Sequence, residues 1–425
     1  MDHPEPTAVI ARVPRAEPTS DGPGGPAVLL TGATGLIGGV LLARYLERTD
    51  RRLFVLVRGR NERESAARLT RLMRQLFGPE HPYGGRVQAI RGDVARPGLA
   101  LRKKRDALAE QVSEITHCAA SVSFELGLDG SRANNLEGTR QMLEFAELCQ
   151  ARGGMRRLSH LSTAYVAGSW EGRFSEDDLD VGQRFRNAYE QSKFEAETLI
   201  GRWRSRLPVT VLRPSIVVGE RDSGWATAFN ALYWPLRAFS RGAVAALPAR
   251  SEALVDVVPA DYVADATIAL SQMREAEGAT FNLTAGAHAT SVGEIVELAS
   301  TYFERPPPRL LDPRLYRHVV HPLLMRASRD ERLRRSLARS EIFFPYFNPK
   351  VSFDNRRARV ALHATDVRLT PLRTYFNRLV QFAVEAEWGR RQLPRAGGSP
   401  ELAAPAHQVP QLAEAQATPV LVPAL

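Results

Sequence analysis

Short apolar runs alternate with longer amphipathic stretches along most of the chain. The runs are four to six residues long and rich in Val, Leu and Ile, as is typical of strands buried on both faces of a parallel sheet. Right-handed connections between such strands place helices on both faces of the sheet. This order predicts the α/β class and a doubly wound Rossmann sheet, whose ligand crevice lies at the carboxyl ends of the strands. The strands are expected at residues 27–30, 53–57, 87–90, 114–117, 157–162, 209–212 and 280–283, and the clearest helices at 38–47, 138–150 and 189–204.

The alternation becomes irregular after Gly219, which suggests a second lobe. We expect a smaller, mostly helical substrate-binding lobe after the Rossmann domain. The N-terminal end is rich in Pro and Gly, and the C-terminal end is rich in Pro and Ala. Both ends are expected to be disordered, because such sequences bury too little apolar surface to form a packed core. The expected division is a leader over 1–26, the Rossmann domain over 27–224 with 255–286 returning to it, the substrate lobe over 225–254 and 287–390, and a tail over 391–425.

A glycine-rich turn directly follows the first expected strand and opens a helix. Its three glycines permit a tight turn, close approach of a pyrophosphate and close helix–strand packing, and the helix N-terminus then faces the negative charge. A glycine triplet alone is weak evidence, because glycine occurs in many turns. In this strand–turn–helix context it predicts a dinucleotide site. The turn contributes Gly32, Thr34, Gly35, Leu36, Ile37 and Gly38.

The end of the second expected strand distinguishes NADP from NAD. NAD-binding proteins place an acid there for the ribose hydroxyls, whereas an arginine suits the 2′-phosphate of NADP. This chain has Arg58 at that point and Arg68 on the helix that follows, so we predict NADPH. An edge-loop arginine in an arginine-rich chain is the alternative interpretation for Arg58. Asp93, after the third strand, suits the adenine amino group, although it suits a turn nearly as well.

Tyr189 and Lys193 are four residues apart in an expected helix and therefore lie on one face. The reference pKa of a phenol is about 10, and a neighbouring ammonium is expected to lower it towards neutrality. Thr163 ends the fifth expected strand at the same sheet edge, where a hydroxyl could hold a carbonyl oxygen and the oxyanion that forms on hydride addition. Side-chain alternation favours Thr163 over Ser162 for this role. With the glycine loop, these residues predict a nicotinamide-dependent reductase.

Several motifs occur in family order from residue 27 to about residue 224, and they resemble the extended short-chain dehydrogenase/reductases. These are TGATGLIGG, LVRGR, GDVARPGLAL, HCAASVSF, NNLEGT, LSTAYVAG, YEQSK and RPSIVVGE. Within that group the chain is most similar to the fatty acyl-CoA reductase and thioester reductase branch, which has a male-sterility-type NAD-binding domain.

The resemblance implies a role for each matching residue. Thr163, Tyr189 and Lys193 would be catalytic, with Asn135 in a supporting role, and Lys193 would bind the nicotinamide ribose. The NADPH site would include the glycine loop and Tyr189 and Lys193, together with Arg58, Arg68, Asp93, Val94, Ala119, Ala120, Pro214, Ser215 and Ile216.

Composition narrows the class of partner and compartment. The net charge is +10, and arginines concentrate between Arg314 and Arg359, which we call the arginine cluster. This cluster is either a solvated helix face or a docking surface for a CoA diphosphate, an acidic carrier protein or a membrane surface. Nucleic acid is not expected, because no aromatic platform accompanies the charge. The nine histidines form no motif with the spacing of metal ligands, so no metal site is expected. The chain has only two cysteines and no apolar signal-peptide core, which favours the cytoplasm. It also has no apolar run long enough to predict a transmembrane segment.

We therefore expect NADPH-dependent reduction of a carbonyl on a hydrophobic substrate, above all an acyl thioester reduced to an aldehyde or alcohol in lipid metabolism. The thioester would arrive as acyl-CoA or on a separate carrier, because no adenylation or carrier domain is recognised. The apolar stretch 225–247 suits an acyl or aryl pocket, although a core helix explains it equally well. The alternatives are a ketone reductase or hydroxysteroid-type dehydrogenase acting on a lipophilic or aromatic metabolite, a nucleotide-sugar epimerase or dehydratase, and a non-catalytic NADP-sensing module.

Overall fold

A computed structural model describes residues 27–123, 126–229, 231–242, 244, 246–327, 346 and 350–395. The expected leader and residues 396–425 of the expected tail lie outside these described residues. So do five members of the arginine cluster, namely Arg329, Arg332, Arg334, Arg335 and Arg339.

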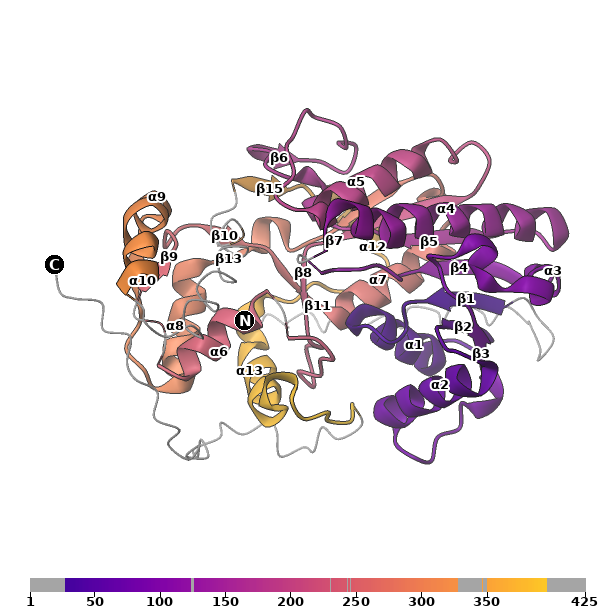
Figure 1. Ribbon diagram of the computed structural model, residues 1–425, viewed down its shortest axis with the longest axis horizontal. Coiled ribbons are helices and arrows are strands. Elements are labelled where there is room, and N and C mark those ends of the chain that lie inside the picture. Colours follow the sequence, from indigo (N-terminus) through magenta and orange to yellow (C-terminus); the bar gives the residue numbers. More distant parts are fainter. Residues whose placement is uncertain are drawn as a thin grey trace, which may run out of the picture.

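Seven parallel strands form the central sheet, in the order β12-β7-β5-β4-β1-β2-β3 (Figure 1). The predicted α/β class is confirmed, and each expected strand lies within two residues of its observed bounds. The strand order reverses between β1 and β4, which opens a crevice at their carboxyl ends. The strands are β1 (Ala27–Thr31), β2 (Leu53–Val57), β3 (Val87–Arg91), β4 (Val112–His117), β5 (Arg157–Leu161), β7 (Val209–Pro214) and β12 (Thr280–Leu283).

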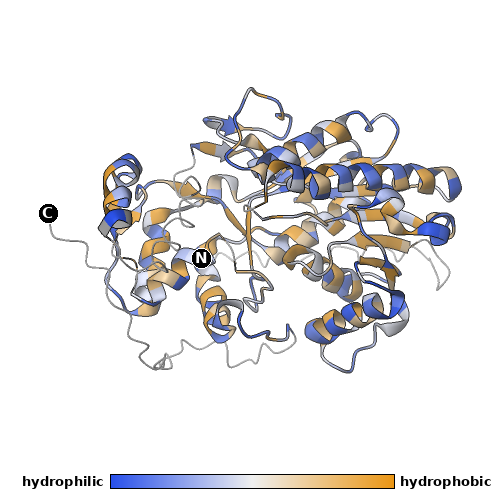
Figure 2. Cartoon of the chain, viewed as in Figure 1, coloured by the Kyte–Doolittle hydropathy of each residue, from blue (hydrophilic) through white to orange (hydrophobic). Residues whose placement is uncertain are grey.

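Helices cover both faces of the sheet, as a doubly wound fold requires. Figure 2 shows the strands as mainly apolar, whereas α4 is largely polar on the side towards the viewer. One face carries α1 (Leu36–Arg48), α2 (Glu62–Phe77) and α7 (Ala260–Gln272). The other carries α3 (Arg105–Ala109), α4 (Leu128–Arg152) and α5 (Ala188–Gly201).

Two helix boundaries differ from expectation by more than two residues. Helix α4 begins at Leu128 rather than at Gly138, because tertiary contacts with α5 hold its polar first turns. Arg132 pairs there with Glu195, its Nε donating to Oε2 at 2.8 Å. Helix α5 ends at Gly201 rather than at Arg204, since the backbone N–H of Arg202 donates to the carbonyl oxygens of Leu199 and Ile200 and not to that of Thr198 one helical turn earlier.

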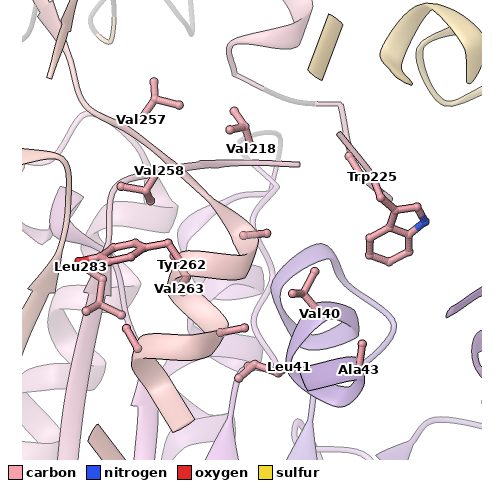
Figure 3. Close-up of a cluster of buried hydrophobic side chains, with 14 of the residues drawn as sticks. Val40, Leu41, Ala43, Val218, Trp225, Val257, Val258, Tyr262, Val263 and Leu283 are labelled. Carbon is pink, nitrogen blue, oxygen red and sulfur yellow. The ribbon is translucent and has the colours of Figure 1, made fainter. Parts of the chain in front are cut away.

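Helices α1 and α7 pack against each other although they are far apart in the sequence. Val40 and Leu41 of α1 and Tyr262 and Val263 of α7 belong to one buried cluster, which Figure 3 shows together with Trp225. Each large apolar side chain buried in this way contributes about 1.5–3 kcal/mol. This cluster holds the glycine-loop helix against the segment that was expected to return to the Rossmann domain.

Several further elements gather at one end of the sheet, on the left of Figure 1. Their position supplies the second wall of the crevice described below. They are α6 (Tyr233–Ser240), α8 (Val292–Phe303), α9 (Pro313–Leu315), α10 (His321–Ala327) and α13 (Phe376–Glu385), with the strand pairs β9 (Ala246–Pro248) and β14 (Arg309–Leu311), and β10 (Leu254–Val255) and β13 (Thr290–Ser291).

The division into two lobes stays a prediction, because segments from both sides of it pack together. Strand β15 (Val351–Phe353) pairs with β6 (Gly172–Phe174), and α12 (Arg356–Leu362) lies beside β12. Within the spans expected to form the Rossmann domain, strand β8 (Ile216–Val218) pairs with β11 (Val257–Pro259).

Arg395 lies within the span expected to be a disordered tail, yet it is bound by two carboxylates. Its guanidinium donates to Glu220 at 2.8 Å and to Glu47 of α1 at 2.5 Å. Glu220 is buried and Glu47 is exposed, so the contact with Glu220 does most to hold this residue against the domain.

Arg395→Ala is expected to lower the free energy of unfolding by about 2 kcal/mol, because it leaves the buried Glu220 carboxylate with fewer partners. Urea denaturation would measure the change, with the exposed Arg391→Ala as the control. Equal midpoints for both variants would contradict a stabilising role of Arg395.

Within the described ranges, no helix has the length and apolar character needed to cross a membrane. The same residues contain no group of three or more His, Cys, Asp or Glu side chains placed to hold a metal ion. Cys118 and Cys149 are both free thiols.

Candidate functional site

A cavity of about 1180 Å³ follows the carboxyl ends of β1, β2, β3, β4, β5 and β7 and extends between α6 and α8. Every predicted site residue except Lys193 and Asn135 lines it. The parallel sheet explains this convergence, since all its strands end at the same edge.

The glycine loop at the head of α1 is built for close backbone contacts. Gly32 has a φ of +78°, and a Cβ there would lie 2.6 Å from the backbone N of Ala119. A Cβ on Gly38 would lie 2.1 Å from the carbonyl oxygen of Gly32. The first turn of α1 also contains no acidic residue, so its N-terminal N–H groups face the cavity without a competing anion. This cradle fits the pyrophosphate of a dinucleotide.

The neighbouring loop after β4 is held by a buried hydrogen-bond pair. Thr31 Oγ1 accepts from the backbone N–H of Ala119 at 3.1 Å and lies 2.9 Å from His117 Nδ1. Burial lowers the pKa of His117 to about 3, so the ring is neutral. His117 therefore braces the loop against β1 and is not a proton donor at neutral pH.

Two arginines face the cavity near the end of β2. Arg68 Nη1 donates to the carbonyl oxygen of Arg58 at 2.9 Å, which directs the Arg68 side chain towards the loop of Arg58. Asp93 also lines the cavity, while its Oδ1 accepts from the backbone N–H of Ala95 at 3.1 Å. Asp93 thus stabilises a turn and also lines the cavity. Its geometry is compatible both with a contact to an adenine amino group and with a role in the turn alone.

Thr163 and Tyr189 meet at the centre of the cavity wall. Thr163 follows β5 and caps a short 3-10 turn, its Oγ1 accepting from the backbone N–H of Tyr165 at 3.2 Å. Tyr189 lies in the first turn of α5, and its side chain is hydrogen-bonded to that of Thr163. The two hydroxyl groups can therefore contact one substrate oxygen together.

Lys193 is buried behind this wall. Its Nζ donates to the carbonyl oxygen of Leu161 at 2.6 Å. Burial lowers the pKa of Lys193 to about 8, and the charge of Glu197 acts in the opposite direction.

The expected lowering of the Tyr189 pKa by Lys193 is not observed. Burial raises the pKa of Tyr189 to about 12, and the hydrogen bond with Thr163 opposes this rise. The loss of hydration around the phenolate outweighs the neighbouring ammonium, whose Nζ is directed at the Leu161 carbonyl.

Asn135 supports the site from behind and does not line the cavity. Its Oδ1 accepts from the backbone N–H of Ser121 at 2.8 Å, and its Nδ2 donates to Ser192 Oγ at 2.9 Å. Ser192 in turn donates to the carbonyl oxygen of Tyr189 at 2.9 Å. Asn135 thus joins the loop after β4 to the turn that carries Tyr189.

Sequence reasoning missed two tyrosines that line the cavity beside Tyr189. The rings of Tyr165 and Tyr346 meet edge to face at 5.1 Å, and Tyr346 Oη donates to Glu190 Oε1 at 2.6 Å. Tyr165 lies within a motif that was recognised, so its position could have been anticipated. Tyr346 is remote in sequence and carries no local signal.

The other end of the cavity is apolar. The stretch 225–247 divides between two roles, since Trp234 and Phe239 line the cavity whereas Trp225 is buried in the core. Helix α8 supplies the opposite wall through Ile295 and Ala299, which sequence reasoning did not identify.

Comparison with known proteins agrees with this geometry. Residues 30–267 match the NAD-binding family described as male sterility protein. The chain belongs to this family. The predicted extended short-chain dehydrogenase/reductase fold and its acyl-CoA and thioester reductase branch are thereby confirmed, and a nicotinamide dinucleotide is the cofactor class of the family.

The chain is similar in sequence to a gramicidin synthase subunit and to a fatty acyl-CoA reductase. A linear gramicidin synthase chain of Brevibacillus parabrevis is 30% identical over 60% of this chain and 5% of its own length. Fatty acyl-CoA reductase 1 of Xenopus laevis is 29% identical over 57% of this chain and 53% of its own length, so the match spans about half of that relative. Among solved structures, the terminal R domain of the myxalamid PKS-NRPS pathway has a TM-score of 0.73 at 26% identity, covering 86% of this chain and 92% of that domain.

Proposed function

We propose that this male sterility family member is an NADPH-dependent reductase of acyl thioesters, with an aldehyde or alcohol as product. The observation that carries the proposal is one continuous cavity that joins a dinucleotide cradle to an apolar arm past the Thr163 and Tyr189 hydroxyl groups. The naming of relatives as fatty acyl-CoA reductases and of a structural neighbour as an R domain supports the same substrate class.

The residues that line the cavity suggest how the carbonyl would be reduced. Bound NADPH would supply the hydride that the carbonyl carbon accepts. Thr163 and Tyr189 would donate hydrogen bonds to the carbonyl oxygen and stabilise the oxyanion, and Tyr189 would then transfer its proton to that oxygen. The resulting hemithioacetal would collapse to release a thiol and an aldehyde. Lys193 would bind the nicotinamide ribose.

The nucleotide half would hold NADPH through its two ends. The glycine loop and the N-terminus of α1 would bind the pyrophosphate, and Arg58 and Arg68 would bind the 2′-phosphate. The backbone around Pro214 and Ser215, which lines the cavity, would face the nicotinamide.

The substrate would arrive as acyl-CoA or on an acyl carrier in the cytoplasm. The described part of the arginine cluster includes the exposed side chains of Arg314, Arg326, Arg356 and Arg359. Arg314 and Arg326 lie on α9 and α10, whereas Arg356 and Arg359 lie on α12, which packs beside β12. Exposed arginines suit a CoA diphosphate, an acidic carrier protein or an anionic membrane surface. We propose that the polar part of the substrate or its carrier docks at residues of this cluster.

The direct test follows NADPH oxidation and thiol release together, with long-chain acyl-CoA and with acyl groups on a phosphopantetheinyl carrier. Equal rates of both signals would support thioester reduction, and trapping of the aldehyde would identify the first product. Activity on lipophilic ketones without any thiol release would instead support a ketone reductase or hydroxysteroid-type dehydrogenase.

Arg58→Ala is expected to raise the KM for NADPH about 10–100-fold and to leave the KM for NADH nearly unchanged, because only NADPH carries the phosphate that Arg58 would bind. Steady-state kinetics with both cofactors would measure this. Arg60→Ala is the matched control, since Arg60 pairs with Glu64 at the surface and does not line the cavity. Equal effects of Arg58→Ala on both cofactors would contradict the phosphate contact.

Ala299→Phe is expected to reduce activity on long acyl chains at least about tenfold while sparing short ones, because the added ring would fill part of the apolar arm. Rates across acyl-CoA chain lengths would measure the shift. Glu297→Ala, an exposed position on the same helix, is the control. A uniform loss at all chain lengths would argue that the arm does not hold the acyl chain.

A further inference from the structure

A buried carboxylate lies directly behind the proposed catalytic residues. Glu197 is on α5, one turn after Lys193, and is 4% exposed. Arg213 Nη2 donates to its Oε2 at 2.7 Å, and Arg213 Nε donates at 3.0 Å. Ser162 Oγ donates to Glu197 Oε1 at 2.5 Å. Three polar groups from three elements therefore converge at one point.

Each partner of Glu197 is adjacent to a residue of the site. Ser162 immediately precedes Thr163, and Arg213 immediately precedes Pro214. Thr163 Oγ1 in turn approaches the carbonyl oxygen of Pro214 at 3.5 Å. Through these contacts Glu197 links the ends of β5 and β7 to the helix that carries Tyr189.

Stability alone is a weak explanation for this arrangement. A buried ion pair loses so much hydration that an apolar pair of similar volume is often at least as stabilising. Two hydroxyl groups that must contact one oxygen, by contrast, have to be held within about 0.5 Å. A bidentate carboxylate–guanidinium pair with a third hydrogen bond gives this directional restraint, which apolar packing does not.

The negative charge of Glu197 also raises the pKa of Lys193, against the effect of burial. The other ionisable side chains packed around this ammonium are neutral at physiological pH, because burial lowers the pKa values of His117 and His160 and raises those of Cys118 and Tyr189. Arg213 is bound to Glu197 itself. Glu197 is therefore the anionic group among the described neighbours of Lys193. The ionisable groups that act on Lys193 are His117 on β4, Cys118 in the loop after it, His160 on β5 and Glu197 on α5, and Tyr189 lies one turn before Lys193 on the same helix.

We propose that Glu197 is a positioning residue for carbonyl reduction: it aligns Thr163 with Tyr189 through Ser162 and Arg213, and it keeps Lys193 protonated. This inference rests on the proposed reduction chemistry of the site but not on the identity of the carbonyl substrate.

Glu197→Gln is expected to lower kcat about 100-fold while the Kd for NADPH changes little. It also removes the negative charge that favours protonated Lys193. The rate falls as the pH rises through the Lys193 pKa, so this alkaline limb should move to lower pH in the variant. Ser162→Ala keeps the charge and removes one alignment contact, so it should lower kcat without moving the limb. Stopped-flow and steady-state kinetics across pH would measure both effects.

Glu195→Gln is the matched control, because Glu195 lies on the same helix and pairs with Arg132 of α4 away from the cavity. Its kcat and pH profile should equal those of the wild type. If Glu197→Gln does not fold, the paired variant Glu197→Met with Arg213→Met removes both charges together and should fold with the same loss of kcat.

Wild-type kcat and an unmoved alkaline limb in a folded Glu197 variant would overturn the proposal and leave a purely structural ion pair. The assays use whichever carbonyl substrate the wild-type enzyme reduces. Failure of the wild type on thioesters would therefore count against the proposed substrate and not against the role of Glu197.

Discussion

Tyr189→Phe is expected to lower kcat for carbonyl reduction at least about 10³-fold and to leave the Kd for NADPH nearly unchanged. In the proposed mechanism the substitution removes the proton donor and one of the two hydrogen bonds to the developing oxyanion, while the ring still fills the cavity wall. Single-turnover kinetics at saturating NADPH would measure the loss, and fluorescence titration would measure cofactor binding. The high pKa of Tyr189, raised to about 12 by burial, keeps the phenol protonated at neutral pH and thus ready to donate.

Tyr302→Phe is the matched control, because Tyr302 lies on α8 and does not line the cavity. It should retain full activity. Comparable activity of Tyr189→Phe and the wild type would show that another group provides the proton. If neither protein reduces any carbonyl yet both bind NADPH, the non-catalytic sensing module becomes the better interpretation.

Gly38→Ala is expected to weaken NADPH binding more than about 100-fold and to destabilise the protein. Alanine normally stabilises a helix interior by about 1 kcal/mol relative to glycine. Here the added Cβ would lie 2.1 Å from the carbonyl oxygen of Gly32 and 2.5 Å from its carbonyl carbon, so the glycine loop has to shift. That loop forms the proposed pyrophosphate cradle, and its displacement would remove the backbone contacts. Calorimetric titration and thermal unfolding would measure the two effects.

Gly39→Ala provides the control at the next position of α1. A Cβ there would meet Ala33 and Trp225 at 3.4 Å, which is ordinary contact distance, so cofactor binding should be retained. Similar losses in the two variants would indicate that α1 tolerates no side chain at all, and the specific clash at Gly38 would no longer explain the result.

The site residues predicted from the sequence share one property: each was predicted from the residues close to it in the chain. Gly32, Gly35 and Gly38 follow a strand and open a helix within eight residues, and the backbone geometry of that turn restricts what can stand there. Tyr189 and Lys193 share a helix face because of the helical period. Thr163 was expected at the end of a strand whose alternation directs Ser162 elsewhere. In the structure both residues follow β5 and line the cavity, and Ser162 Oγ binds Glu197.

Other parts of the site depend on contacts between distant segments. Asn135 lies behind the cavity because α4 packs on α5, and Tyr346 enters the site from a segment far along the chain. Helix α8 supplies one wall of the apolar arm, although nothing in its own amphipathic pattern distinguishes it from a core helix. The upward shift of the Tyr189 pKa follows from burial, which no spacing in the sequence measures.

The sequence by itself thus determined the α/β class and the seven strands, and it predicted the dinucleotide loop and the Thr163, Tyr189 and Lys193 set, since each is encoded in short-range periodicity or in the steric needs of a single turn. Only the tertiary structure decided how these residues are held: the Glu197 and Arg213 link, the bracing by Asn135, the wall of α8 and the balance between burial and charge on Tyr189. Those features arise from desolvation and from packing between segments that the chain brings together on folding, and neither is a property of any local stretch.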